Sequence, residues 1–124
     1  MEEFTVVGKR LPRVDSVVKA TGEAQYAADM ELPGMLHGKM LRSPHPHARI
    51  LNVDVSRAER LPGVKAVLTS KDTSGYRYGD LVMGKGDEPF LAMEKVRFVG
   101  DEIATVAAVD EDTAEEALDL IEVE

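Results

Sequence analysis

The sequence predicts an α+β domain with an antiparallel or mixed sheet, and three observations support this fold class. Several short stretches alternate apolar and polar residues with the two-residue period of half-buried strands. One stretch near the end carries apolar residues at helical spacing. Most connections are too short for parallel crossovers, which need roughly a dozen residues. Because 124 residues fit one domain with one modest core, we expect a single domain over residues 1–124.

A first strand is predicted in the stretch MLHGKMLRS, which follows the turn signal Leu32-Pro33-Gly34. Alternate positions of this strand form two faces, of which the first leans apolar: Leu36, Gly38, Met40 and Arg42 against His37, Lys39 and Leu41. We expect His37 to be a partly buried strand residue.

The clearest half-buried strand is predicted in ARILNVDVS, where two sets of residues alternate: Ile50, Asn52 and Asp54 against Leu51, Val53 and Val55. Ser56 can then cap a short helical turn, RAERL, that Pro62-Gly63 stops. VKAVLTS is predicted as a third strand.

The pattern is lost between Thr73 and Met93, where glycines and scattered apolar residues replace any periodicity. A stretch of this length is either a functional loop or a segment ordered by a partner. Tyr76 and Tyr78 could stack on a ligand, but in a glycine-rich loop such a pair more often anchors the loop to a core or partner.

Strand chemistry resumes in VRFVGDEIATVAAVD, with a break at Gly100-Asp101. The best helix is DEDTAEEALDLI, where Asp112 and Glu115 resemble a capping box. Its apolar face has the spacing i, i+3, i+4, i+7: Ala114, Ala117, Leu118 and Ile121. The closing IEVE begins a strand-like pattern and stops, so the chain is expected to be cut from a longer one.

Charge and composition exclude several classes of function. The net charge is −8, and residues 101–124 alone hold ten acidic and no basic residues, so nucleic-acid binding is not expected. This acidic end is more typical of a solvated helix face than of a docking surface. The absence of cysteine excludes disulfides, zinc–thiolate sites and iron–sulfur ligation by this chain, and it fits a reducing cytoplasm. No apolar run could cross a bilayer, and the N-terminus has no signal-peptide pattern.

The stretch RSPHPHARI is the strongest candidate for chemistry. On an extended backbone His45 and His47 would face the same side and could begin a zinc or iron site with an aspartate. Pro44 and Pro46 favour the alternative, a rigid connector that needs no metal. We therefore expect a connector and no metal site.

The other patterns are weak. Gly84-Lys85-Gly86 is more typical of a loop tip than of a phosphate cradle. The carboxylates of residues 110–116 sit on a predicted exposed helix start. Four serines are candidate nucleophiles, and none of them lies in a GxSxG setting: Ser43, Ser56, Ser70 and Ser74. The residues therefore predict no catalytic, no cofactor-binding and no metal-binding position in this chain.

The order of the motifs adds a resemblance. The segments GKRLPRVDSVVKATGEAQYAADMELPGMLHGKMLRSPHPHARILNVDVSRAERLPGVKAVLT and VRFVGDEIATVAAVDEDTAEEALDLIEVE resemble the N-terminal region of the xanthine dehydrogenase/aldehyde oxidase family of molybdenum hydroxylases. The resemblance runs from about Val7 to Glu124. It implies the α/β-hammerhead fold with two or three short helices. Within the family, the loop length and LAMEKVRFVGDE most resemble the large subunit of 4-hydroxybenzoyl-CoA reductase.

The resemblance implies a parent oxidoreductase acting on an aromatic, purine or aldehyde substrate. Its cofactors would be molybdopterin-bound molybdenum, [2Fe–2S] clusters and FAD. Its partners would be the remainder of the large subunit and the iron–sulfur and flavin subunits or domains, in the cytoplasm. The family's pterin-binding residues and catalytic glutamate lie beyond this region, so the isolated chain is expected to be inactive. In one departure, Glu102 stands where the family commonly has proline, which puts the local strand geometry in question.

Two other functions stay open. The chain could be a free-standing interaction or assembly module that uses loop 73–94 and the acidic C-terminal helix; this predicts an exposed apolar patch. It could also be a small metalloprotein that uses His45 and His47.

Overall fold

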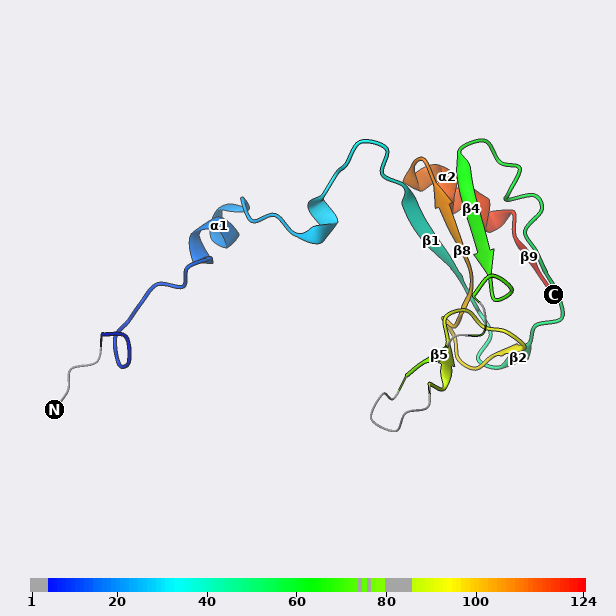
Figure 1. The fold of residues 1–124 in the computed structure, drawn as a ribbon, viewed down its shortest axis with the longest axis horizontal. Coiled ribbons are helices and arrows are strands. Elements are labelled where there is room, and N and C mark those ends of the chain that lie inside the picture. The colour runs from blue at the N-terminus through cyan, green and yellow to red at the C-terminus, as the bar shows by residue number, and fades with distance from the viewer. Residues whose placement is uncertain (1–4, 74, 76, 80–85) are drawn as a thin grey trace. The chain divides into compact units, whose positions relative to one another are not determined.

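The computed structural model describes residues 5–73, 75, 77–79 and 86–124. The chain divides into two units, Met1–Pro33 and Gly34–Glu124, which we call unit 1 and unit 2 (Figure 1). Unit 1 holds the helix α1, Ser16–Thr21, and the 3-10 turn η1, Ala27–Asp29. Neither contains a buried residue, and the sequence patterns predict neither.

Unit 2 is built on a three-stranded antiparallel sheet in the order β1-β8-β4 (Figure 1). The strands are β1, His37–Arg42, β4, Val64–Thr69, and the central β8, Glu102–Ala108. The helix α2, Glu111–Asp119, packs against all three strands. The predicted α+β class with an antiparallel sheet is therefore confirmed.

The core lies between β8 and α2 and consists of small residues. Its central cluster contains five buried residues: Ala58, Ala104, Val106, Ala117 and Ile121. A second cluster lies at the beginning of β8: Ala92, Val96 and Ile103. Alanines at the points of contact let the helix backbone approach the sheet closely, which leaves Val106 as the largest fully buried side chain in the described part of the chain.

The first predicted strand is confirmed as β1, and its faces can now be distinguished. His37, Lys39 and Leu41 are half-buried, whereas Met40 and Arg42 are exposed. The apolar-leaning face is thus the outer one, because α2 packs on the side that carries Lys39 and Leu41. The expectation for His37 is confirmed.

The single strand predicted over ARILNVDVS is wrong. It forms two short strands with different partners: β2, Ala48–Arg49, pairs with β7, Lys95–Val96, and β3, Val53–Asp54, pairs with β9, Glu122–Val123. The change of pairing partner falls between Ile50 and Leu51. The backbone N–H of Ile50 donates to the carbonyl of Glu94, and that of Leu51 to the carbonyl of Glu124. Within IEVE, the strand pattern is confirmed for Glu122–Val123.

The turn after β3 is also capped by another residue than predicted. The carboxylate of Asp54 accepts the backbone N–H of Ser56 at 2.9 Å. Residues 56–60 form turns and no assigned helix. The third strand is confirmed as β4, and Gly100, with φ +96°, marks the predicted break between β7 and β8.

Within loop 73–94 the described residues form a short antiparallel hairpin of β5, Arg77–Tyr78, and β6, Glu88–Pro89. The rings of Tyr78 and Phe90 lie 5.2 Å apart, so Tyr78 anchors the loop onto its own hairpin. The other predicted features of this loop lie outside the described residues: Ser74, Tyr76, Gly84 and Lys85.

The helix α2 has the predicted apolar face, with Ala114 and Ala117 fully buried. The predicted cap is wrong by two positions. Asp110 is extended, with φ −147°, and its carboxylate accepts the backbone N–H of Thr113 at 2.7 Å. Asp112 lies inside the first turn instead.

Asp110→Ala is therefore expected to lower the free energy of unfolding by about 1 kcal/mol, because an N-terminal amide of α2 loses its acceptor. The matched control, Asp112→Ala, removes only a charge near the helix N-terminus and should cost about half as much or less. Urea unfolding followed by circular dichroism measures both. Equal losses would contradict the assignment of Asp110 as the cap.

Candidate functional site

The stretch RSPHPHARI connects β1 to β2 as a series of bends over residues 44–47. Ser43 is buried, with 3 % of its surface exposed, and fixes the start of the connector. Its backbone N–H donates to the carbonyl of Asp101, and its carbonyl accepts the N–H of Gly100. Its hydroxyl accepts the N–H of His45 and lies 3.0 Å from the carbonyl of the same residue. The predicted connector is therefore tied to the break between β7 and β8.

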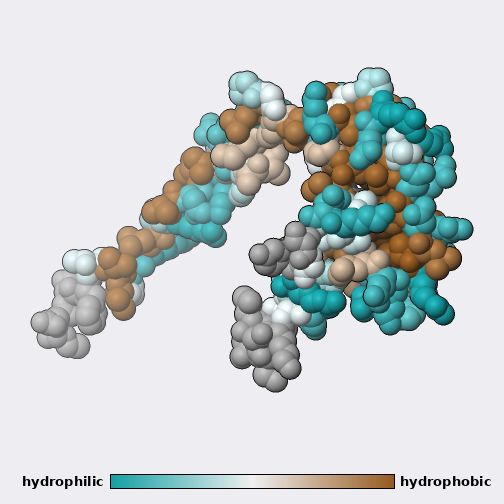
Figure 2. Space-filling view, turned by 45° about the vertical axis from the view of Figure 1, so that its right-hand side comes forward, coloured by the Kyte–Doolittle hydropathy of each residue, from teal (hydrophilic) through white to brown (hydrophobic). Residues whose placement is uncertain are grey.

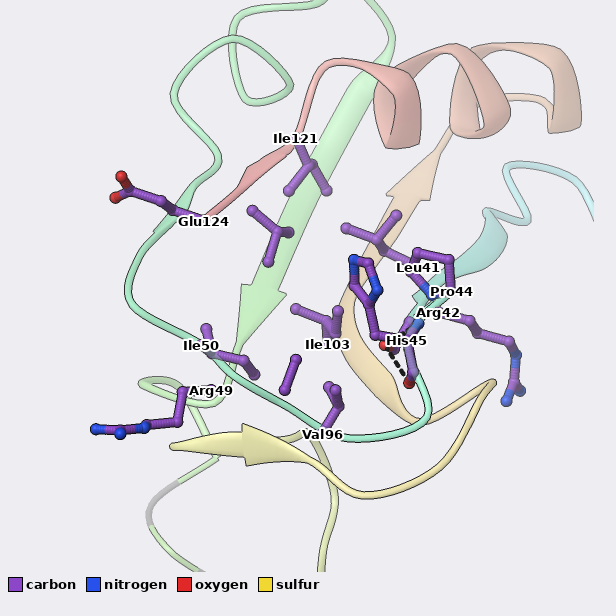
Figure 3. A pocket seen from close by; sticks show the side chains of 13 residues that line it. Leu41, Arg42, Pro44, His45, Arg49, Ile50, Val96, Ile103, Ile121 and Glu124 are labelled. Carbon is purple, nitrogen blue, oxygen red and sulfur yellow. Dashed lines mark hydrogen bonds between the residues drawn. The ribbon is translucent and has the colours of Figure 1, made fainter.

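A cavity of about 350 Å³ opens beside this connector (Figure 3). Five separated parts of unit 2 line it, and most of its lining is apolar: Leu41, Arg42, Ser43, Pro44, His45, Ala48, Arg49, Ile50, Val96, Ile103, Ile121, Val123 and Glu124. Figure 3 shows Leu41, Ile103 and Ile121 pointing towards one another across the cavity. The size and lining suit one or two apolar side chains of a partner.

The charged residues at the rim of the cavity are either paired or point away from it. The guanidinium of Arg42 donates to Glu102 at 2.6 Å and to the carbonyl of Gly100 at 2.9 Å. The side chains of Arg49 and Glu124 point away from the cavity (Figure 3). The imidazole of His45 is the one titratable ring that lines the cavity within the described part of the chain. The cavity thus offers apolar surface and no converging acid, base and nucleophile.

Glu102, which stands where the family commonly has proline, has a local role in this structure. Its carboxylate accepts the bond from Arg42 at the point where the register between β1 and β8 shifts, between Leu41 and Arg42. The strand entry is therefore held by this ion pair, although both side chains are partly exposed and the stabilisation is small.

The structure does not bring the predicted histidines into one site. His37 lies in β1, while His45 and His47 lie in the exposed connector. Across the described residues no group of three or more histidines and carboxylates could hold a metal ion. The absence of metal, cofactor and catalytic residues stays a prediction.

Two acidic residues of α2 lie beside Lys39 of β1. The ammonium of Lys39 contacts Glu111, and Glu115 lies 4.0 Å away. The hydrogen bond to Glu111 raises the pKa of Lys39, and the same bond lowers the pKa of Glu111. Glu111 is exposed and Lys39 is half-buried, so the pair contributes little stability and helps to orient the start of α2 on β1.

Stability is expected to fall in acid. Besides Asp15 and Glu111, which pair with basic side chains, three aspartates of unit 2 have a pKa below the ordinary value of 3.8, because nearby residues donate hydrogen bonds to them: Asp54 from Ser56, Asp72 from Thr69 and Asp110 from Thr113. A lowered folded pKa gives stability that is present above 3.8 and is lost as pH falls through the folded values. The urea concentration at the unfolding midpoint should therefore fall when the pH is lowered below about 4.

Asp110→Asn is the control for this pH dependence, because an amide oxygen can still accept the bond from Thr113 but does not titrate. The variant should show a shallower loss of stability in acid than the parent chain. An unchanged slope would mean that Asp110 does not contribute.

The sequence patterns indicated the connector but not the apolar cavity beside it. Its lining residues come from positions 41 to 124, and each looks like an ordinary core residue in its own segment. No local pattern distinguishes Ile50 or Ile103, which line the cavity, from Ala104, which is buried in the core.

The comparisons with known proteins identify the family. The hammerhead domain described as "Aldehyde oxidase and xanthine dehydrogenase, a/b hammerhead domain" matches residues 21–124. The chain belongs to this family. The predicted resemblance to xanthine dehydrogenases and aldehyde oxidases, and the hammerhead fold that it implies, are confirmed.

Two relatives and one solved structure show the extent of the match. The chain is 50% identical to a probable xanthine dehydrogenase component from Bacillus subtilis (strain 168), over 90% of this chain and 15% of that protein. It is 44% identical to the nicotinate dehydrogenase large molybdopterin subunit of Eubacterium barkeri, over 99% of this chain and 28% of that protein. Quinoline 2-oxidoreductase from Pseudomonas putida 86 matches with a TM-score of 0.83 and 40% identity, over 94% of this chain and 16% of that one.

The hammerhead chain therefore spans between about one seventh and little more than a quarter of these relatives. Their names differ from that of 4-hydroxybenzoyl-CoA reductase, and the closer resemblance to that enzyme stays a prediction. No helix in the described ranges is long and apolar enough to cross a membrane.

Proposed function

We propose that this chain is a structural, docking domain of the large subunit of a molybdenum-cofactor-dependent oxidoreductase, and that residues outside it perform the chemistry. The observation that carries the proposal is the share of each protein that matches. Almost all of this chain corresponds to only 15% or 16% of an oxidoreductase chain. The proposal keeps residues 1–124 as one hammerhead region of that subunit.

The cavity supports a docking role. It is apolar inside, and its rim charges are turned outward or paired, as in the bond from Arg42 to Glu102. An apolar cavity without converging polar groups binds a hydrophobic side chain better than it stabilises a developing charge. We propose that a neighbouring part of the same enzyme fills it.

The cofactors proposed for the parent enzyme are molybdopterin-bound molybdenum, [2Fe–2S] clusters and FAD. The clusters do not fit this chain, because cysteine thiolates hold them and the sequence has no cysteine. Their ligands must come from the iron–sulfur subunits or domains, which with the flavin-binding part and the remainder of the large subunit are the proposed partners. An aromatic, purine or aldehyde substrate and a cytoplasmic location belong to the same proposal.

The test is the mass and metal content of the native protein that carries this N-terminus, purified from its source cells. The proposal expects a polypeptide several times heavier than 13.6 kDa that co-purifies with molybdenum, and it expects the isolated 124-residue chain to be inactive. A native chain that ends near Glu124 and carries no molybdenum would favour the free-standing assembly module instead.

A further inference from the structure

Unit 1 exposes its large apolar side chains. Nine of them have at least 40 % of their surface exposed: Val6, Val7, Leu11, Val14, Val17, Val18, Tyr26, Met30 and Leu32. None of its described residues is buried. Figure 2 shows apolar side chains following one another along this unit. A run of exposed apolar side chains of this kind is typical of a surface that another protein segment covers.

The charged groups around Val14, in contrast, pair with one another. Asp15 accepts from Arg13 and from Lys19, both at 2.6 Å, and these bonds lower its pKa. Val14 is fully exposed beside them, and Val17 is 68 % exposed on α1. Around Val14 the surface without a partner is therefore the apolar one.

Unit 1 also lacks the means to hold its own conformation. The helix α1 has six residues, whereas isolated helices shorter than about 12–15 residues are marginal in water. Without buried apolar surface, nothing offsets the entropy of ordering the backbone. Its ordered path therefore requires a covering surface.

The solved structure that matches this chain is long enough to supply such a surface. The match to quinoline 2-oxidoreductase covers 94% of this chain, so most of unit 1 is included, although it has no core of its own. The matched chain is about six times longer, since this chain covers 16% of it. The large remaining part of such a chain is a ready source of covering surface.

We propose that residues 5–33 are a docking arm whose apolar side chains are covered by the remainder of the same large-subunit polypeptide. The inference rests on the proposed function, and it assigns the surface through which that subunit holds this domain. Residues 5–33 carry four basic and four acidic side chains and no net charge, so the covering surface should be chiefly apolar.

The test is amide hydrogen exchange of residues 5–33 in the native full-length enzyme and in the isolated 1–124 chain. We expect fast exchange in the isolated chain and exchange slowed by about 100-fold or more in the enzyme. The variant Val14→Asp/Val17→Asp in the full-length enzyme should lose this protection, and trypsin should then cut at Arg13 and Lys19 about tenfold faster. The matched control, Val14→Leu/Val17→Leu, should keep both properties.

Three results would overturn the proposal. Equally fast exchange in the enzyme and the isolated chain would refute the arm, while a heavy, molybdenum-containing polypeptide would still support the proposed function. Protection in the isolated chain that disappears on dilution would make a second copy the covering surface. A native chain that ends near Glu124 would refute the proposed function and the arm together.

Discussion

Val106→Asp is expected to remove at least about half of the folding free energy of unit 2 at 25 °C. Val106 lies in the middle of β8, paired with Lys39 on β1 and Val67 on β4, and exposes 1 % of its surface. A carboxylate there would have no partner, and an uncompensated buried charge costs at least about 3–5 kcal/mol. The whole of unit 2 is expected to be stable by only about 5–10 kcal/mol.

The measurement is far-ultraviolet circular dichroism with urea unfolding, and the matched control is Leu68→Asp. Leu68 lies on the neighbouring strand β4 but is 44 % exposed, so its carboxylate stays in water. The control should lose about 1 kcal/mol or less, through strand propensity alone. Similar losses for both variants would show that β8 is not the centre of the core.

The features predicted correctly from the sequence are those that depend on local periodicity. The spacing of Ala114 and Ala117 predicts the buried face of α2, and the alternation around Lys39 predicts β1. Both patterns are complete within one element. The fold class follows from them, because short connections leave few topologies other than antiparallel ones.

The errors arise where distant residues decide. Residues 48–55 have a strand pattern throughout, yet the chain changes partner after Ile50 because Glu94 and Glu124 supply the carbonyls on either side. The cap of α2 is a choice between two aspartates two positions apart. Asp110 is the cap because its extended backbone places its carboxylate against the N–H of Thr113. The cavity escapes prediction for the same reason, since no single segment contains it.

Gly63→Ala is the second prediction with a large effect, because two penalties combine at this position. Gly63 has φ +100°, a conformation that side chains rarely adopt, and its carbonyl accepts the N–H of Val109 at 3.0 Å. A Cβ atom would lie 3.0 Å from Cγ2 of Thr113 and 3.1 Å from Cγ2 of Val109. Backbone strain of about 1–3 kcal/mol therefore adds to about 1–3 kcal/mol of overpacking against α2.

Gly100→Ala separates the two penalties. Gly100 has nearly the same backbone angle, φ +96°, but a Cβ atom there would meet nothing within 4 Å. Gly100→Ala should therefore lose stability only through backbone strain. The difference in unfolding free energy between the two variants then measures the cost of the contact with α2. Adding Thr113→Ser to Gly63→Ala removes the closest methyl group and should recover part of the loss in a double-mutant cycle. If Gly63→Ala and Gly100→Ala cost the same in urea unfolding, the turn at Gly63 does not pack against the first turn of α2.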